Sequence, residues 1–185
     1  MINELDGLND IALENALWAI GMNLHNEAED KQWQYLQYIR SNRQNLGGKL
    51  YFRCLTNILH VFYTNMSAMN KQLYLELLLA INPQTVDGIG IGDVLEILGI
   101  LVKGCTPDQA LRLFCYVQNN AELCLGDPSA LVSACNCFRY MYPEVSADLR
   151  RNILDMISNL KAKNPYRELD TTLGFTLHSL QEVST

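Results

Sequence analysis

A run of basic and aromatic residues between Arg43 and Arg53 is the part of this sequence best suited to bind another molecule. Arg43, Lys49 and Arg53 carry positive charge, and Tyr51 and Phe52 place aromatic rings between them. Basic side chains can hold phosphates, and aromatic rings can stack on a base. We therefore predict a partner-binding patch formed by Arg43, Lys49, Tyr51 and Arg53. RNA contact is one interpretation of this patch, and a solvated helix face that pairs with acidic neighbours is the other.

The remaining reactive side chains do not form a pattern that predicts catalysis or metal binding. Cys135 and Cys137 are the one close cysteine pair, but two residues apart on a helix they point to different sides and cannot share an ion. The chain lacks a GxSxG elbow. Cys105 precedes a helix start, which could lower the pKa of its thiol, but a small linker residue is the simpler interpretation. We expect a protein that is not an enzyme, with no catalytic residue, no metal and no cofactor.

Two further groups of residues suggest chemistry less strongly. The glycines of Gly88-Ile89-Gly90-Ile91-Gly92 match neither GxxxxGK[ST] nor GxGxxG, and no strand precedes them. We interpret residues 82–92 as the most flexible linker of the chain. The acidic residues Glu27, Glu29 and Asp30 are explained by a solvated turn that leads into a helix.

A recurring apolar pattern indicates the elements that must position these residues. A triplet spaced i, i+4, i+7 occurs five times, and a pair spaced i, i+3 follows each of the first four triplets. Repetition of two short amphipathic helices every ~40 residues is typical of helical-hairpin repeats. The triplets are Leu13/Leu17/Ile20, Leu55/Leu59/Phe62, Val94/Leu98/Leu101, Leu131/Cys135/Phe138 and Leu173/Leu177/Leu180, and the pairs are Leu36/Ile39, Leu78/Ile81, Phe114/Val117 and Leu154/Ile157.

Local signals place the ends of the expected helices. Asn9 or Asp10 is expected to cap the first helix, and Thr106-Pro107-Asp108-Gln109 has the form of a capping box. A single uninterrupted helix is predicted over residues 48–63. An asparagine follows each second helix, where a left-handed residue often ends a helix. We predict this role for Asn42, Asn82, Asn119 or Asn120, and Asn159; a ladder of functional amides along one rim is the alternative.

These patterns together predict an all-α fold, a right-handed superhelix (α-solenoid) of about four and a half helical hairpins. Residues 1–185 are expected to form a single helical-repeat domain. The predicted repeats cover approximately 9–42, 48–82, 92–120, 127–160 and an incomplete 170–185.

Composition narrows the class of partner. The formal net charge is −6, which weighs against broad contact with a phosphate backbone. Residues 1–42 carry two basic and seven acidic residues, whereas residues 43–86 carry four basic and one acidic. No apolar run approaches the ~20 residues of a membrane span, and no secretory signal is visible. The six cysteines are interpreted as reduced thiols packed like small apolar residues, which favours an intracellular compartment.

The segment DPSALVSACNCFRYMYPEVSADLRRNILDMISN, residues 127–159, carries the strongest resemblance to known families. Its Asp-Pro helix start, short gap and second helix with an apolar face resemble HEAT-type repeats. The segment also resembles the helical repeats of FAST-kinase-like and octotricopeptide proteins of organellar RNA metabolism. The likeness covers about residues 87–160 and rests on pattern and period. The RAP-type segment of many octotricopeptide proteins is not recognisable here.

We therefore expect a non-enzymatic scaffold or adaptor that mediates protein–protein contacts within a larger complex. Its acidic first repeat suits a basic partner, and its second repeat suits an acidic one. An RNA-binding helical-repeat protein of organellar RNA metabolism is the alternative. We expect no membrane partner and no small-molecule substrate. The expected location is the cytoplasm or an organelle matrix, with the mitochondrion an option if a presequence has been removed.

Overall fold

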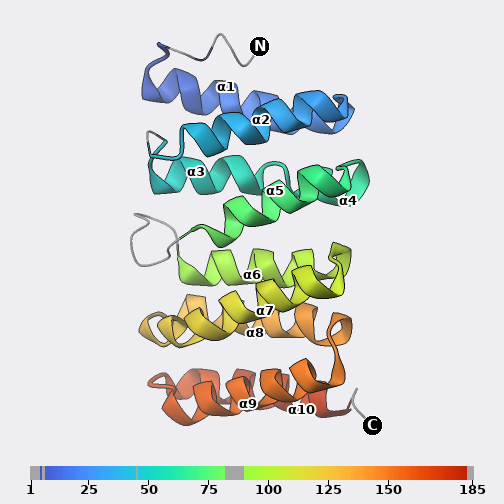
Figure 1. The fold of residues 1–185 in the computed structure, drawn as a ribbon. Helices are drawn as coiled ribbons and strands as arrows, with labels where there is room; N and C mark the ends of the chain where they lie inside the picture. The colour runs from blue at the N-terminus through green and yellow to red at the C-terminus, as the bar shows by residue number, and fades with distance from the viewer. Residues whose placement is uncertain (1–4, 6, 45, 82–89, 183–185) are drawn as a thin grey trace. The chain divides into compact units, whose positions relative to one another are not determined.

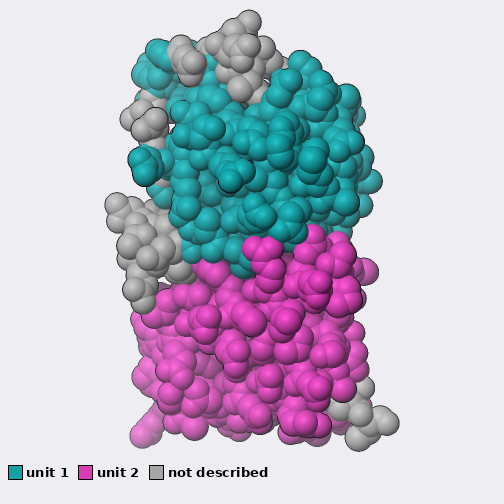
Figure 2. All heavy atoms as spheres, viewed as in Figure 1, with its two compact units in different colours: residues 1–89 teal, residues 90–185 magenta. Residues whose placement is uncertain are grey.

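The computed structural model describes residue 5 and residues 7–44, 46–81 and 90–182, and every regular element in these ranges is helical (Figure 1). The prediction of an all-α fold is confirmed. The chain divides into two compact units, unit 1 (residues 1–89) and unit 2 (residues 90–185), which Figure 2 colours separately and which are described separately below. The single domain expected from the sequence stays a prediction.

Unit 1 consists of two helical hairpins. The first helices of the two hairpins, α1 and α3, pack on each other, as do the second helices, α2 and α5, and α5 also contacts α3. The helices are α1 (Asp10–Asn23), α2 (Glu29–Ser41), α3 (Gly47–Thr56), α4 (Leu59–Thr64) and α5 (Ala68–Leu79), with a short 3₁₀ helix η2 (Leu24–Asn26) after α1.

Unit 2 also packs the first helices of successive hairpins together. Helices α6, α8 and α10 pack in succession, α7 packs on α6, and α9 packs on α10. The triplet Val94, Leu98 and Leu101 of α6 is fully buried, as its spacing predicts. The helices are α6 (Ile91–Leu101), α7 (Pro107–Asn120), α8 (Pro128–Met141), α9 (Ala147–Lys163) and α10 (Asp170–Glu182), joined by 3₁₀ helices η3 (Val102–Gly104), η4 (Ala121–Gly126), η5 (Tyr142–Glu144) and η6 (Arg167–Leu169).

The single helix predicted over residues 48–63 is wrong, because the chain breaks between α3 and α4. At the break, the N–H of Ile58 donates to the carbonyl of Leu55, three residues earlier, at 3.3 Å. The carbonyl of Cys54, which Ile58 would bond in a regular α-helix, instead lies 3.3 Å from the hydroxyl of Tyr35 on α2. A side chain that enters the backbone hydrogen-bond ladder is a recognised cause of such breaks.

The predicted helix starts are confirmed. Asn9 Oδ1 accepts a hydrogen bond from the N–H of Ala12 at 3.0 Å. Thr106 and Gln109 form the expected capping box at the start of α7. These bonds satisfy backbone donors that have no partner inside the helix.

The predicted left-handed conformation is wrong for the asparagines that the structure describes, since every non-glycine residue in the described ranges has negative φ. Asn42 has φ −102°. The amides of Asn42 and Asn120 instead donate to the carbonyl four residues earlier, at 3.0 Å and 2.8 Å. The carbonyl of Tyr38 also accepts the backbone N–H of Asn42, so the amide adds a second bond to it, and the helix ends without a left-handed residue. Asn159 lies inside α9 and donates to Glu122, and Asn82 lies outside the described residues.

Two glycines allow α6 to lie directly against α8. A Cβ at Gly92 would stand 2.6 Å from the Cα of Ala130, and a Cβ at Gly99 would stand 2.7 Å from the Cα of Cys137. Seven residues apart, the two glycines share one face of α6. Ile91 and Gly92 therefore belong to a packed helix and not to the flexible linker predicted over residues 82–92, whose residues 82–89 lie outside the described residues.

This contact predicts that Gly99→Ala destabilises the protein by roughly 1–3 kcal/mol, because the added methyl group meets backbone atoms of α8 that cannot turn away. Gly126→Ala is the matched control, since nothing lies within 4 Å of a Cβ at Gly126. Urea unfolding followed by circular dichroism measures both variants. Equal midpoints for the two would contradict the close packing of α6 on α8.

Candidate functional site

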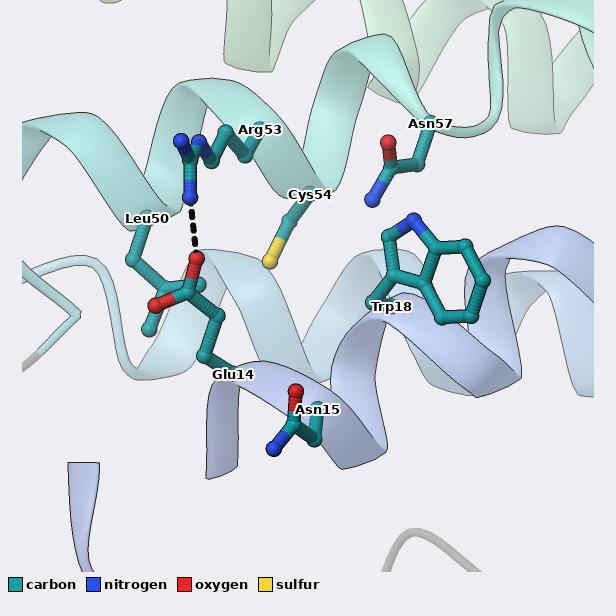
Figure 3. A pocket seen from close by; sticks show the side chains of 7 residues that line it. All are labelled: Glu14, Asn15, Trp18, Leu50, Arg53, Cys54 and Asn57. Carbon is teal, nitrogen blue, oxygen red and sulfur yellow. Dashed lines mark hydrogen bonds and ion pairs between the residues drawn. The ribbon is translucent and has the colours of Figure 1, made fainter. Parts of the chain in front are cut away.

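A groove of about 360 Å³ lies between α1 and α3 in unit 1 (Figure 3). Trp18, Leu50 and Cys54 give it an apolar lining, and two asparagines and an ion pair supply its polar groups. Figure 3 shows the carboxamide of Asn57 beside the indole of Trp18, and the thiol of Cys54 pointing between the two helices. The lining residues are Glu14, Asn15, Trp18, Leu50, Arg53, Cys54 and Asn57.

Helical periodicity places these side chains. Residues 14, 15 and 18 share one side of α1, while Leu17 and Ile20 are buried on the other. Residues 50, 53, 54 and 57 follow the i, i+3, i+4, i+7 spacing that aligns side chains along one face of α3. The indole of Trp18 is 55% exposed, which is high for the largest apolar side chain.

The hydroxyl of Tyr35, a residue of α2, lies close to both helices that form the groove. Its oxygen lies 3.3 Å from the carbonyl of Leu17 on α1 and 3.3 Å from the carbonyl of Cys54 on α3. One O–H donates to one acceptor at a time, so the two carbonyls share this donor. A Cβ at Gly21 would stand 3.1 Å from the Tyr35 hydroxyl oxygen, so the glycine leaves room for it. Tyr35 therefore fixes the spacing between the two helices that form the groove.

The thiol of Cys54 serves as an apolar surface of the groove. Burial raises its pKa to about 12, although a hydrogen bond with Tyr35 acts in the opposite direction. The thiol is therefore protonated at neutral pH, whereas the thiolate is the form that attacks electrophiles or binds metals.

One end of the groove is closed by an ion pair between Arg53 and Glu14. Both side chains are half-exposed, so solvent screens the pair, and its contribution to stability is small. Its consequence for recognition is larger, because the guanidinium and the carboxylate neutralise each other at the groove edge. For Arg53, this pair agrees with the interpretation that the basic residues pair with acidic neighbours, although the sequence did not identify Glu14 as the partner.

Two of the four predicted patch residues contact the end of α5. Arg43 donates to the carbonyl of Ala80, and its guanidinium lies 5.5 Å from the ring centroid of Tyr51. The Tyr51 side chain is buried, and its hydroxyl donates to the carbonyl of Leu77 at 2.8 Å. Burial raises the pKa of Tyr51 to about 12, against a lowering effect of Arg43. Both residues thus satisfy carbonyls at a helix C-terminus, and the ring of Tyr51 has no open face for a base.

The other two patch residues lie on α3 with different surroundings. Lys49 is exposed, and Arg53 lines the groove with Trp18. The structure thus divides the predicted patch between the end of α5 and the groove. It also adds Trp18, Asn15 and Asn57, which sequence reasoning missed. The available signal was Trp18 itself, a large apolar residue outside the triplet phase of its helix.

The cysteines mostly pack as predicted. Cys54, Cys124, Cys135 and Cys137 are buried, whereas Cys115 is exposed on α7, contrary to expectation. Burial raises the pKa of Cys124 to about 12 and also raises the pKa of Cys137.

Two histidines that are far apart in the sequence lie in contact in the structure. His25 and His60 meet edge to face in unit 1, with their ring centroids 5.3 Å apart. In the ranges that the structure describes, no group of three or more histidine, cysteine or acidic side chains is placed to hold a metal ion.

Comparison with known proteins gives no relative: no family model, curated protein or solved structure matches the chain. Among the described residues, no helix has the length and apolar character needed to cross a membrane.

The position of Tyr35 between the groove walls predicts that Tyr35→Phe destabilises the protein by about 1–3 kcal/mol, because a buried carbonyl loses its donor. Tyr140→Phe removes the same atom from an exposed side chain and should stay within about ±0.5 kcal/mol. Urea unfolding compares the two variants with the parent. A Tyr35→Phe variant as stable as the Tyr140→Phe variant would show that the hydroxyl does not hold α1 to α3.

Proposed function

We propose that this chain is a non-enzymatic helical-repeat scaffold that holds an extended segment of a partner protein in the groove between α1 and α3. The observation that carries the proposal is the exposed indole of Trp18, with a carboxamide beside it and an apolar floor next to it. Tryptophan is enriched among residues that dominate protein-binding energies.

The polar groups of the groove suit a peptide backbone. Each carboxamide, from Asn15 and Asn57, offers both a donor and an acceptor, which matches the alternating N–H and C=O groups of an extended chain. A volume of about 360 Å³ has room for a few side chains and falls in the range of ligand pockets. The indole face then supplies the apolar contact that anchors one partner side chain.

RNA binding, the alternative function, is less well supported by the same residues. Arg53 is paired with Glu14, Arg43 is bonded to a helix end, and the ring of Tyr51 is buried. A nucleic-acid site needs basic groups that replace counterions on phosphate. The net charge of −6 adds a repulsive background.

We infer that the scaffold has a superhelical architecture. Its support lies within each unit, where first helices of successive hairpins pack together. A single hairpin cannot bury its apolar face alone, and packing against a neighbouring hairpin buries it. We infer that this chain is a subunit of a larger intracellular complex.

The proposal predicts that peptides which bind this protein lose affinity when Trp18 is removed. Random peptides of about twelve residues, displayed on phage, would be selected on the immobilised protein and measured by fluorescence anisotropy. Trp18→Ala should weaken the selected peptides about 30-fold or more, as expected for a central aromatic anchor. Ile11→Ala removes another exposed apolar side chain of α1, outside the groove, and should change affinity less than about threefold.

A second arm separates protein binding from RNA binding. A labelled single-stranded RNA of about twelve nucleotides should bind weakly or not at all, with any binding lost as salt rises. RNA binding that is tighter than peptide binding, and that Lys49→Gln with Arg53→Gln abolishes, would overturn the proposal. Equal peptide affinity for the parent and Trp18→Ala would also overturn it.

A further inference from the structure

A second groove, of about 450 Å³, lies in unit 2 between the N-terminal ends of α7 and α9. Its apolar lining includes Leu111 from α7 and Leu149 from α9, with Val145 from the turn before α9. Leu111 is 46% exposed, so an apolar surface remains open to solvent here. This groove is built from the second helices of two hairpins, whereas the Trp18 groove is built from first helices.

The groove carries three negative charges at its edge. Asp108, Glu144 and Asp148 line it, are exposed, and come from three different elements. No lysine, arginine or histidine is among its lining residues in the described part of the chain. The groove therefore combines an apolar surface with a negative electrostatic potential.

Two arginines at the start of α9, Arg150 and Arg151, leave this negative charge largely uncancelled. Arg151 approaches Asp148 at 3.8 Å, but both side chains are almost fully exposed, so the pair is weak. Arg150 is directed to the carbonyls of Tyr142 and Pro143, at 3.0 Å and 2.9 Å.

Asp108 and Asp148 are not needed as the capping residues of their helices, so their carboxylates can bind a partner. The side chains of Thr106 and Ser146 already cap α7 and α9 by accepting from backbone N–H groups. Asp108 and Asp148 lie in the first turns, where a carboxylate stabilises the helix dipole while its oxygens stay open to solvent. Glu144 belongs to η5 and lies outside both helices.

We propose that this groove binds a basic, amphipathic segment of a partner protein. An apolar side chain of the segment packs between Leu111 and Leu149, and its lysines or arginines pair with Asp108, Glu144 and Asp148. Charge complementarity selects this occupant, because phosphate groups of RNA or of an anionic membrane are repelled by the same carboxylates. The proposal concerns different residues and a different unit from the Trp18 groove, so either can fail without the other.

The probe is a fluorescein-labelled peptide of about twelve residues, with leucine at helical spacing and lysine or arginine elsewhere. Its control has glutamate at every basic position. Fluorescence anisotropy should show binding of the basic peptide alone, weakening as salt rises from about 50 mM to about 200 mM.

Two variants with the same change in net charge locate the binding. Asp108→Asn with Glu144→Gln and Asp148→Asn should weaken the basic peptide about tenfold or more. Asp93→Asn with Glu168→Gln and Glu182→Gln removes three exposed carboxylates elsewhere in unit 2 and should weaken it less than about threefold. Equal weakening by the two variants would mean general charge attraction and would overturn the proposal, as would no binding by the parent.

A single substitution tests the apolar half without altering charge. Leu111→Asn should weaken the basic peptide about fivefold or more, since one anchoring contact is lost. Leu123→Asn changes another exposed leucine outside the groove and should have little effect. Circular dichroism confirms folding of every variant, and Leu111→Asn decides the question if the triple variant does not fold. Full affinity in a folded Leu111→Asn variant would overturn the proposal.

Discussion

The buried hydroxyl of Tyr35 is the contact on which the candidate site in unit 1 depends. It lies within hydrogen-bonding distance of a carbonyl on α1 and a carbonyl on α3, the two walls of the groove. The carbonyl on α3 is available because the chain breaks after Thr56, and Gly21 on α1 leaves space for the hydroxyl oxygen. The break after Thr56 and the glycine at position 21 therefore both allow the Tyr35 hydroxyl to lie between α1 and α3. With the walls held in this way, Trp18 remains exposed at the groove because its own helix face is turned away from the core.

The helical fold was predictable because apolar spacing and capping chemistry are local properties of a sequence. Val94, Leu98 and Leu101 lie in the core, and Thr106 and Gln109 form the capping box that their order indicates. The features that were missed depend on residues distant in the sequence. The break after α3 involves a tyrosine of α2, and Gly99 is required by an α8 residue 38 positions later, Cys137. The left-handed conformation was wrongly predicted for Asn42 because its side chain bonds back to the last turn of α2 while its backbone keeps a negative φ.

The candidate site was predictable only in part, for the same reason. Arg53 was named from its charge, and it does line the groove. An acidic partner for Arg53 was one of the two interpretations, but Glu14 itself could not be identified, because it comes from the preceding hairpin, as do Asn15 and Trp18. Arg43 and Tyr51 have the residue types of a binding patch, yet their polar groups go to carbonyls near the end of α5. Residue type suggests what a side chain could bind, but tertiary packing decides whether its polar groups are already bonded within the protein.

The most direct test of protein docking at the Trp18 groove is photo-crosslinking in the source cell. A benzophenone amino acid at Asn15 reports on the groove, and the same group at Tyr140, an exposed position in unit 2, is the control. Protein docking predicts a crosslinked protein product at position 15 that survives nuclease, is absent from position 140, and disappears with Trp18→Ala. A nuclease-sensitive product at position 15, or the same products from both positions, would contradict it.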